Sequence, residues 1–281
     1  MTSSASKKKK DAIGDHGLSA KENRKVEDQT SIPSPVVYHT VRAEGEVELA
    51  RPAQSLWWSG LVAGIAISSS VFMQGILHGY LPNAPWSAAV ASLGYCTGFL
   101  IVVLGRMQLF TETTITAVLP LLVERTWRAL MSTLRLWGIV FVANLAGTAL
   151  ASIMAIYARV ATPEQLAGFY AVAQTLASKT PLNVLLQGVP AGFFIAAMVW
   201  MLAASKEGRF WIIALMSYII ALGGSTHVVV GSTEVFLLMF SGQLAPLHGI
   251  FGVLVPALVG NMVGGTGLFA LLAYGQVKEE I

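Results

Sequence analysis

Charged residues are scarce in this chain of 281 residues: only 12% are Asp, Glu, Lys or Arg, whereas 54% are hydrophobic. The mean hydropathy is +0.65, which is far above the usual value for a soluble domain. About half of the charges lie within the first 51 residues. The rest of the chain carries too little charge for a soluble globular enzyme and is expected to lie in a membrane.

Cysteine and catalytic motifs are nearly absent as well. Cys96 is the only cysteine, so no intramolecular disulfide can form. The sequence contains no H-E-x-x-H, no G-x-S-x-G, no Walker motif and no paired cysteines for a metal or haem. We therefore expect a protein that is not an enzyme and binds no cofactor or metal. The lack of a basic pattern with interleaved aromatic residues argues against a nucleic-acid partner.

Long stretches without charge predict membrane spans, because a helix that crosses a bilayer needs about 20 predominantly apolar residues. Helix-breaking residues divide the first stretch at residues 78–85, and polar residues divide the last one at 241–248. Six spans are predicted, at residues 56–77, 87–110, 136–157, 183–204, 211–240 and 250–274. The fifth is too long, and too polar in its middle, to be one regular helix.

The N-terminal segment 1–50 is rich in Ser, Lys, Asp and Glu and is predicted to be a disordered tail. Its run of lysines at 7–10 is interpreted as a topology signal, with binding to lipid headgroups as the alternative. Loops on the side of the tail carry Arg125, Arg128, Arg135, Lys206 and Arg209, and those on the other side only Arg159 and Lys179. This asymmetry predicts that both termini are cytoplasmic. The spans are expected to form a six-span transmembrane domain over residues 51–278, and 279–281 to be a cytoplasmic end.

The first three spans resemble the last three. The glycine-rich segment 60–64 matches 188–192 at an offset of 128 that is kept over the following residues. Two shorter segments also have echoes: Asn144 with Gly147 is followed by Asn261 with Gly264, and Phe110-Thr111-Glu112 by Ser232-Thr233-Glu234. Three spans in each repeat force the second copy to be inverted relative to the first. The spaced glycines predict close packing of helices.

Two spans are interrupted where a lipid-facing helix would be continuous. Residues 105–108 interrupt the second span, and residues 223–227 interrupt the fifth. Unwound backbone at membrane depth is tolerated only inside protein or along a watery cavity, so both interruptions predict a substrate pathway.

Four ionisable residues accompany the interruptions, and such residues inside spans are candidates for function. His227 is interpreted as a pathway residue. For Arg106, Glu112 and Glu234 we favour buried ion pairs that hold the interrupted segments together, because an unpaired buried charge is costly.

Several of these residues together resemble the formate/nitrite transporter family. They are Leu109-Phe110-Thr111 after the interruption of the second span, His227 in the fifth span, Asn144 with Gly147, and Pro256 through Asn261 to Gly264. The resemblance covers about residues 50–278. It implies an all-α, aquaporin-like protomer with its own pore, assembled as a homopentamer in the bacterial inner membrane. It also implies transport of a small monovalent weak-acid anion.

The resemblance further implies roles for individual residues. An apolar constriction is formed by Tyr95, Phe99, Leu109, Phe110 and Ile220. Thr111 faces His227 as a hydrogen-bond partner, and Lys179 concentrates the anion in the vestibule. His227 is expected to donate a proton, directly or through water, because a neutral acid crosses an apolar constriction more easily than its anion.

The surroundings of the central histidine depart from the family pattern. Members usually carry Glu-His-Ser there, with an Asn one turn later, whereas this chain has Thr226, Val228 and Gly231 in those places. Two alternatives to anion transport therefore remain open. The pore could conduct a neutral or different small solute, or the protein could be a non-transporting membrane scaffold whose tail recruits a partner.

Overall fold

Helices cover every predicted span in the computed structural model, which describes residues 22, 31–205 and 207–281. The spans are α4 (Ala53–Tyr80), α5 (Ser87–Leu104), α8 (Trp127–Tyr157), α10 (Pro181–Ala204), α11 (Arg209–Leu222) with α12 (Val228–Phe240), and the run His248–Val277. Five of these helices are long and apolar enough to cross a membrane, whereas α11 and α12 are shorter. The all-α architecture with six spans is confirmed.

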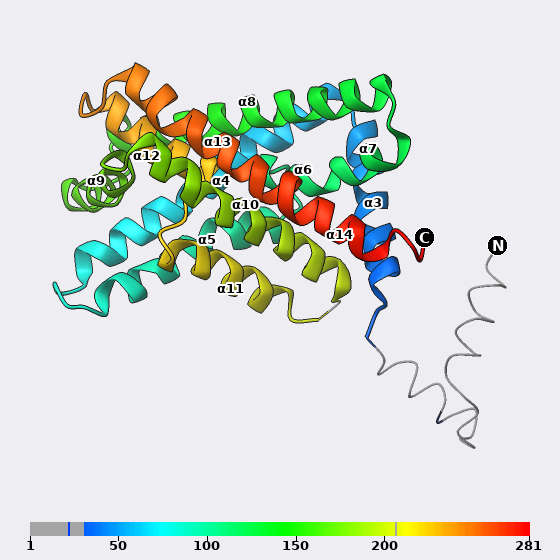
Figure 1. Ribbon diagram of the computed structural model, residues 1–281. Helices are drawn as coiled ribbons and strands as arrows, with labels where there is room; N and C mark the ends of the chain where they lie inside the picture. Colours follow the sequence, from blue (N-terminus) through cyan, green and yellow to red (C-terminus); the bar gives the residue numbers. More distant parts are fainter. Residues whose placement is uncertain (1–21, 23–30, 206) are drawn as a thin grey trace. The chain divides into compact units, whose positions relative to one another are not determined.

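Both predicted interruptions are present. The second span ends as α5 at Leu104, and the chain resumes as α6 (Phe110–Thr116) and α7 (Val118–Glu124). The fifth span is split between α11 and α12. Figure 1 shows α6 and α12 inside the bundle of longer helices.

The boundaries of the third and sixth spans differ from the prediction. α8 begins at Trp127, well before the predicted residue 136, because the Thr126 side chain caps it by accepting a hydrogen bond from the Ala129 backbone N–H at 3.1 Å. The sixth span alternates π- and α-helical turns. Its elements are η1 (His248–Leu254), α13 (Val255–Met262), η2 (Val263–Ala270) and α14 (Leu271–Val277).

Glycines bring the backbones of paired helices into direct contact in both repeats. A Cβ atom at Gly64 of α4 would overlap the main-chain oxygen of Asn144 in α8 and approach Gly147 to 2.9 Å. In the second repeat, a Cβ at Gly192 of α10 would overlap the main-chain oxygen of Asn261. The repeated helix pairs thus pack in the same way, as expected for an inverted repeat.

Adding one methyl group at Gly64 is expected to force α4 away from α8. We expect Gly64→Ala to lower the stability by about 1–3 kcal/mol, as overpacking usually does. Thermal unfolding of the purified protein in detergent measures the effect. Gly79→Ala is the matched control, because nothing lies within 4 Å of a Cβ at Gly79. Equal unfolding temperatures for the two variants would contradict the close contact.

The prediction of a disordered tail is wrong for its last part. Residues Ser34–Ala50 form helix α3, which buries Val37, Tyr38 and Val41. This spacing places the three side chains on one helix face, and the burial of that face stabilises the helix. Figure 1 places α3 beside α14 at one end of the bundle. Residues 1–21 and 23–30 of the predicted tail, which include the lysine run, lie outside the described residues.

A helix that we did not predict covers the opposite end of the bundle. α9 (Pro163–Ala177) connects α8 to α10 and packs against α4 and α12 (Figure 1). A capping box starts it, in which Thr162 and Gln165 exchange side-chain to backbone hydrogen bonds.

Candidate substrate pathway

The two interrupted spans have the same backbone geometry. Gly105 ends α5 with φ −75° and ψ −2°, and Gly223 ends α11 with φ −74° and ψ −1°. The next residue in each break is left-handed, with φ 54° at Arg106 and φ 63° at Gly224. A left-handed residue other than glycine costs about 1–2 kcal/mol. The surrounding structure must offset this cost at Arg106.

Asn144 of α8 holds the first break. Its Oδ1 accepts a hydrogen bond from the Phe110 backbone N–H at 2.9 Å. Its Nδ2 donates to the carbonyl oxygens of Gly60 at 2.8 Å and Gln108 at 2.9 Å. One buried amide thus links α4, the break and the start of α6.

Asn261 of α13 repeats these three contacts in the second break. Its Oδ1 accepts from the Val228 backbone N–H at 2.8 Å. Its Nδ2 donates to the carbonyl oxygens of Gly188 at 2.9 Å and Thr226 at 2.8 Å. The paired asparagines recognised in the sequence therefore do more than pack helices, because they satisfy the backbone groups that the breaks release.

These contacts correct one part of the sequence repeat. Val228 in α12 takes the place that Phe110 takes in α6, one helical turn before the Ser232 with which the sequence pairs it. Leu109 and His227 are then equivalent, and each is the N-cap residue of its helix.

The structure brings Thr111 and His227 together where the two breaks meet. Thr111 Oγ1 lies 2.7 Å from His227 Nε2, and His227 Nδ1 accepts a hydrogen bond from the Val230 backbone N–H at 3.2 Å. Because a backbone N–H can only donate, Nδ1 carries no proton and Nε2–H donates to Thr111. Both side chains are buried, with 2% of His227 exposed. Thr111 Oγ1 has no other hydrogen-bond partner in the described part of the chain, so its own proton is free for a substrate.

The five predicted constriction residues are buried in one apolar cluster: Tyr95, Phe99, Leu109, Phe110 and Ile220. The Phe99 ring lies edge-on to His227, with 5.1 Å between ring centroids, and 5.5 Å from the Tyr95 ring. Phe110 instead packs against Phe141 of α8 at 5.0 Å. Phe99 thus lies directly against the histidine ring, and Tyr95 lies against Phe99.

A cavity of about 310 Å³ lies on the α9 side of this cluster. Its lining includes His227, Tyr95, Lys179, Glu234 and His78. The cavity therefore connects the predicted vestibule lysine with the central histidine.

Lys179 also supports the second break. Its Nζ donates a hydrogen bond to the carbonyl oxygen of Gly224 at 2.8 Å. Burial lowers the pKa of Lys179, and the nearby Glu234 opposes this shift. The lysine thus joins the vestibule to the backbone of the break.

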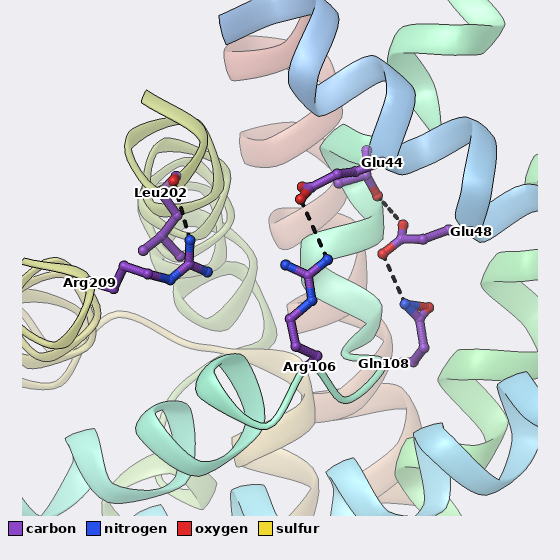
Figure 2. Close-up of polar contacts among 7 residues, drawn as sticks. Glu44, Glu48, Arg106, Gln108, Leu202 and Arg209 are labelled. Carbon is purple, nitrogen blue, oxygen red and sulfur yellow. Dashed lines mark hydrogen bonds and ion pairs between the residues drawn. The ribbon is translucent and has the colours of Figure 1, made fainter. Parts of the chain in front are cut away.

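A larger cavity of about 760 Å³ lies at the other end of the pathway, between α3, the first break, α6, α10 and the start of α11. Figure 2 shows the ion pair between Arg106 and Glu44 of α3, at 3.6 Å. Arg209 makes a separate contact there, from Nη1 to the carbonyl oxygen of Leu202 at 3.5 Å (Figure 2). α3 therefore forms one wall of this mouth and places charged groups in it.

Glu48 is a partly buried acid of α3 at this mouth. Its carboxylate accepts a hydrogen bond from Gln108 Nε2 at 2.9 Å (Figure 2). It also accepts one from Thr116 Oγ1 at 2.5 Å. Burial raises the pKa of Glu48, and the two hydrogen bonds partly oppose the rise. These bonds tie α3 to the first break and to α6.

The predicted ion pairs between the interrupted segments are wrong. Arg106 pairs instead with Glu44 of α3, and both side chains are exposed. Among the described residues, Glu112 and Glu234 form no ion pair, and Glu112 Oε1 is buried without a hydrogen-bond partner. Each acid lines a different mouth, Glu112 the larger cavity and Glu234 the smaller one.

Glu44 and Glu48 were not predicted as site residues, because they lie in the segment that was interpreted as a disordered tail. The signal was present as the helical spacing of Val37, Tyr38 and Val41 in the same segment.

A buried histidine and threonine between two facing helix breaks, with a cavity at each mouth, define a membrane channel or transporter. The sequence model of the formate/nitrite transporter family matches residues 35–275. The chain belongs to this family, as the sequence resemblance indicated, and is a multi-pass membrane protein and not an enzyme.

Individual relatives agree with this assignment. The chain is 36% identical over 261 residues to the inner membrane protein YfdC of Escherichia coli strain K12, which covers 92% of this chain and 84% of that protein. Two solved structures share the fold. A pentameric formate channel with formate bound has a TM-score of 0.69 and 18% identity, and covers 81% of this chain and 98% of its own. An FNT family ion channel has a TM-score of 0.75 and 15% identity, and covers 85% and 98%.

Proposed function

We propose that each protomer carries a small monovalent weak-acid anion of the formate or nitrite kind through its own pore, together with a proton. The contact between His227 and Thr111, placed between the two cavities, carries this proposal. The family of the chain and the formate bound to the related pentameric channel support the substrate class.

The apolar cluster around Phe99 sets the physical requirement. A bare anion loses its hydration there, at a cost of several kcal/mol or more. Protonation removes the charge, and the remaining cost is that of a neutral polar molecule. His227 orients the Thr111 hydroxyl, which then donates a hydrogen bond to the acid as it passes.

Lys179 is proposed to raise the anion concentration in the smaller cavity. Its ammonium group lies at the break and lines the same space as His227. A positive charge at a partly enclosed mouth attracts anions and speeds their entry.

The assembly and orientation are part of the same proposal. The related formate channel is pentameric, which supports a homopentamer of this chain. The relative in Escherichia coli is an inner membrane protein, which supports the bacterial inner membrane as the location. The excess of Lys and Arg in the loops at the α3 end supports cytoplasmic termini. The smaller cavity then faces the outside.

Liposomes that contain the purified protein and a pH-sensitive dye test the function. Formate, nitrite, acetate, lactate and hydrosulfide are added in turn, and empty liposomes are the control. We expect faster internal acidification than in empty liposomes for at least one anion. Folded, pentameric protein that gives no acidification with any of them would overturn the proposal.

A neutral small solute is the second candidate. The uncharged tautomer of His227 beside the Phe99 ring favours it, because this site carries no net positive charge of its own. Faster swelling of the same liposomes in small neutral solutes, without acidification by any anion, would support this candidate.

A further inference from the structure

Glu234 is a buried acid with no role so far. It lies in α12 with 9% of its surface exposed, and it lines the smaller cavity with His227 and Lys179. Its carboxyl group makes no hydrogen bond or ion pair with any residue that the structure describes. The ammonium group of Lys179 donates to Gly224 and lies beyond ion-pair distance of Glu234.

The position of Glu234 on α12 sets the order in which an entering solute meets the acid and the histidine. His227, Val230, Gly231 and Glu234 line the cavity from one face of α12. Seven residues separate the histidine from the acid, which is about 10 Å along an α-helix. α12 runs from the break towards the α9 end, so a solute that enters there meets Glu234 before His227.

His227 is a poor source of the proton that transport needs. Its Nδ1 is occupied by the Val230 backbone N–H, and its single ring proton is used in the contact with Thr111. Giving that proton away would leave an imidazolate anion, and an imidazolium would lose the Val230 hydrogen bond. The ring is built to donate a hydrogen bond, and the proton itself has to come from another group.

A carboxyl group in the cavity meets the requirement. An ionised carboxylate that is buried at membrane depth without an ion-pair partner is expensive, which favours the protonated form. The charge of Lys179 in the same cavity offsets part of this cost. Transfer of a proton between two carboxylic acids is also close to balanced, because donor and acceptor are of the same chemical kind.

We propose that Glu234 donates the proton to the entering anion, an inference that rests on the proposed function and deepens it. The O–H bond of the Glu234 carboxyl group breaks, and an O–H bond forms on an oxygen of the anion. The bonding electron pair stays on the Glu234 carboxylate, and a hydronium ion from the bulk solution then reprotonates it through the water of the cavity, which leaves water. The substrate class is therefore the oxyanions of weak acids whose acidity is close to that of a carboxylic acid.

Other titratable groups face the same space. Lys179, His78, Tyr95 and His227 line the cavity with Glu234. Lys179 balances the carboxylate that remains after transfer, and the pH profile of uptake reports on all of these groups together.

The direction in which one variant changes the transport rate shows whether Glu234 donates a proton or only adds a negative charge to the cavity lining. Glu234→Gln keeps the shape of the side chain but cannot release a proton. If Glu234 supplies the proton, formate-driven acidification of liposomes falls at least tenfold. If Glu234 only lines the mouth, removal of a negative charge speeds the entry of an anion. An unchanged or faster rate would therefore overturn the proposal.

Two further variants are the controls. Glu164→Gln makes the same change at an exposed position in the first turn of α9 and is expected to leave the rate unchanged. Glu234→Asp keeps a proton donor and is expected to recover part of the rate, and Asp behaving like Gln would contradict proton transfer. The wild-type rate separates the two proposals. If wild type acidifies the liposomes and Glu234→Gln does so equally fast, only the role of Glu234 is overturned. If wild type itself gives no acidification, the proposed function is overturned.

Discussion

Replacing His227 by alanine is expected to slow formate-driven acidification of liposomes by about 10- to 100-fold. The variant leaves the Thr111 hydroxyl without the Nε2–H donor that orients it at 2.7 Å. Leaving the buried Thr111 hydroxyl without its hydrogen-bond partner costs about 1–3 kcal/mol, which corresponds to about this range of rates. The initial rate of acidification, normalised to the protein content of the liposomes, is the measurement.

Alanine at position 227 also removes the cap of α12, which costs about 1 kcal/mol of stability. His227→Asn separates the two effects. Asparagine is a preferred N-cap residue and can accept the hydrogen bond of the Val230 backbone N–H, but its shorter side chain does not reach Thr111. We expect this variant to unfold near the wild-type temperature and to transport as slowly as His227→Ala. Wild-type transport by His227→Asn would mean that the ring serves only as a cap.

Thr111 gives the reciprocal test of the same contact. Thr111→Val keeps the shape of the side chain but removes the hydroxyl group, and we expect a loss similar to that of His227→Ala. Thr111→Ser keeps the hydroxyl group and is expected to retain most of the rate. Because α6 and α12 come from opposite repeats, equal losses from either side would show that the two breaks act as one site.

The sequence was sufficient for the spans, the breaks and the central pair. Six charge-poor stretches located the helices, and the glycines at 105 and 223 located the interruptions. These features follow from local rules, because a bilayer requires apolar length and a glycine tolerates an unwound backbone. The meeting of Thr111 and His227 came from the family resemblance.

The charges near the breaks could not be placed from the sequence. Arg106 lies next to a break, yet its partner Glu44 belongs to α3, far away along the chain. Nothing local to Arg106 identifies that partner, since the contact depends on the position of α3 at the end of the bundle. The hydrogen bonds that Glu48 accepts from Gln108 and Thr116 depend on the position of α3 in the same way.

The two breaks also show that sequence matches between internal repeats do not always identify the equivalent residues. Matching letters paired Thr111 with Thr233, whereas the hydrogen bonds of the asparagines align the helix starts at Phe110 and Val228. Short matches between polar residues can occur at successive turns of a helix, so the pairing of 110–112 with 232–234 was displaced by one turn. Backbone angles and capping contacts fix the equivalence because they depend on geometry and not on residue type.

Removing the amide of Asn261 is expected to be the most destabilising polar change in the channel domain. Asn261→Leu keeps a similar volume but breaks hydrogen bonds to Val228, Gly188 and Thr226. At about 1 kcal/mol for each bond the loss is about 3 kcal/mol, or about 6–12 °C in the unfolding temperature of a chain of this size. Thermal unfolding in detergent, followed by loss of the monodisperse species, measures it. Asn183→Leu is the matched control, because its side chain is exposed at the start of α10.

The inverted repeat predicts that the equivalent asparagine of the first repeat is equally important for stability. Asn144 makes the same three kinds of contact at closely similar distances, so Asn144→Leu is expected to lower the unfolding temperature by a similar amount. Aspartate at either position keeps the acceptor for the helix N-terminus but turns a carboxylate towards two carbonyl oxygens. It should therefore be no better than leucine. Aspartate variants as stable as wild type would mean that the two donated hydrogen bonds contribute little and that the breaks are held mainly by the packing of α4 on α8 and of α10 on α13.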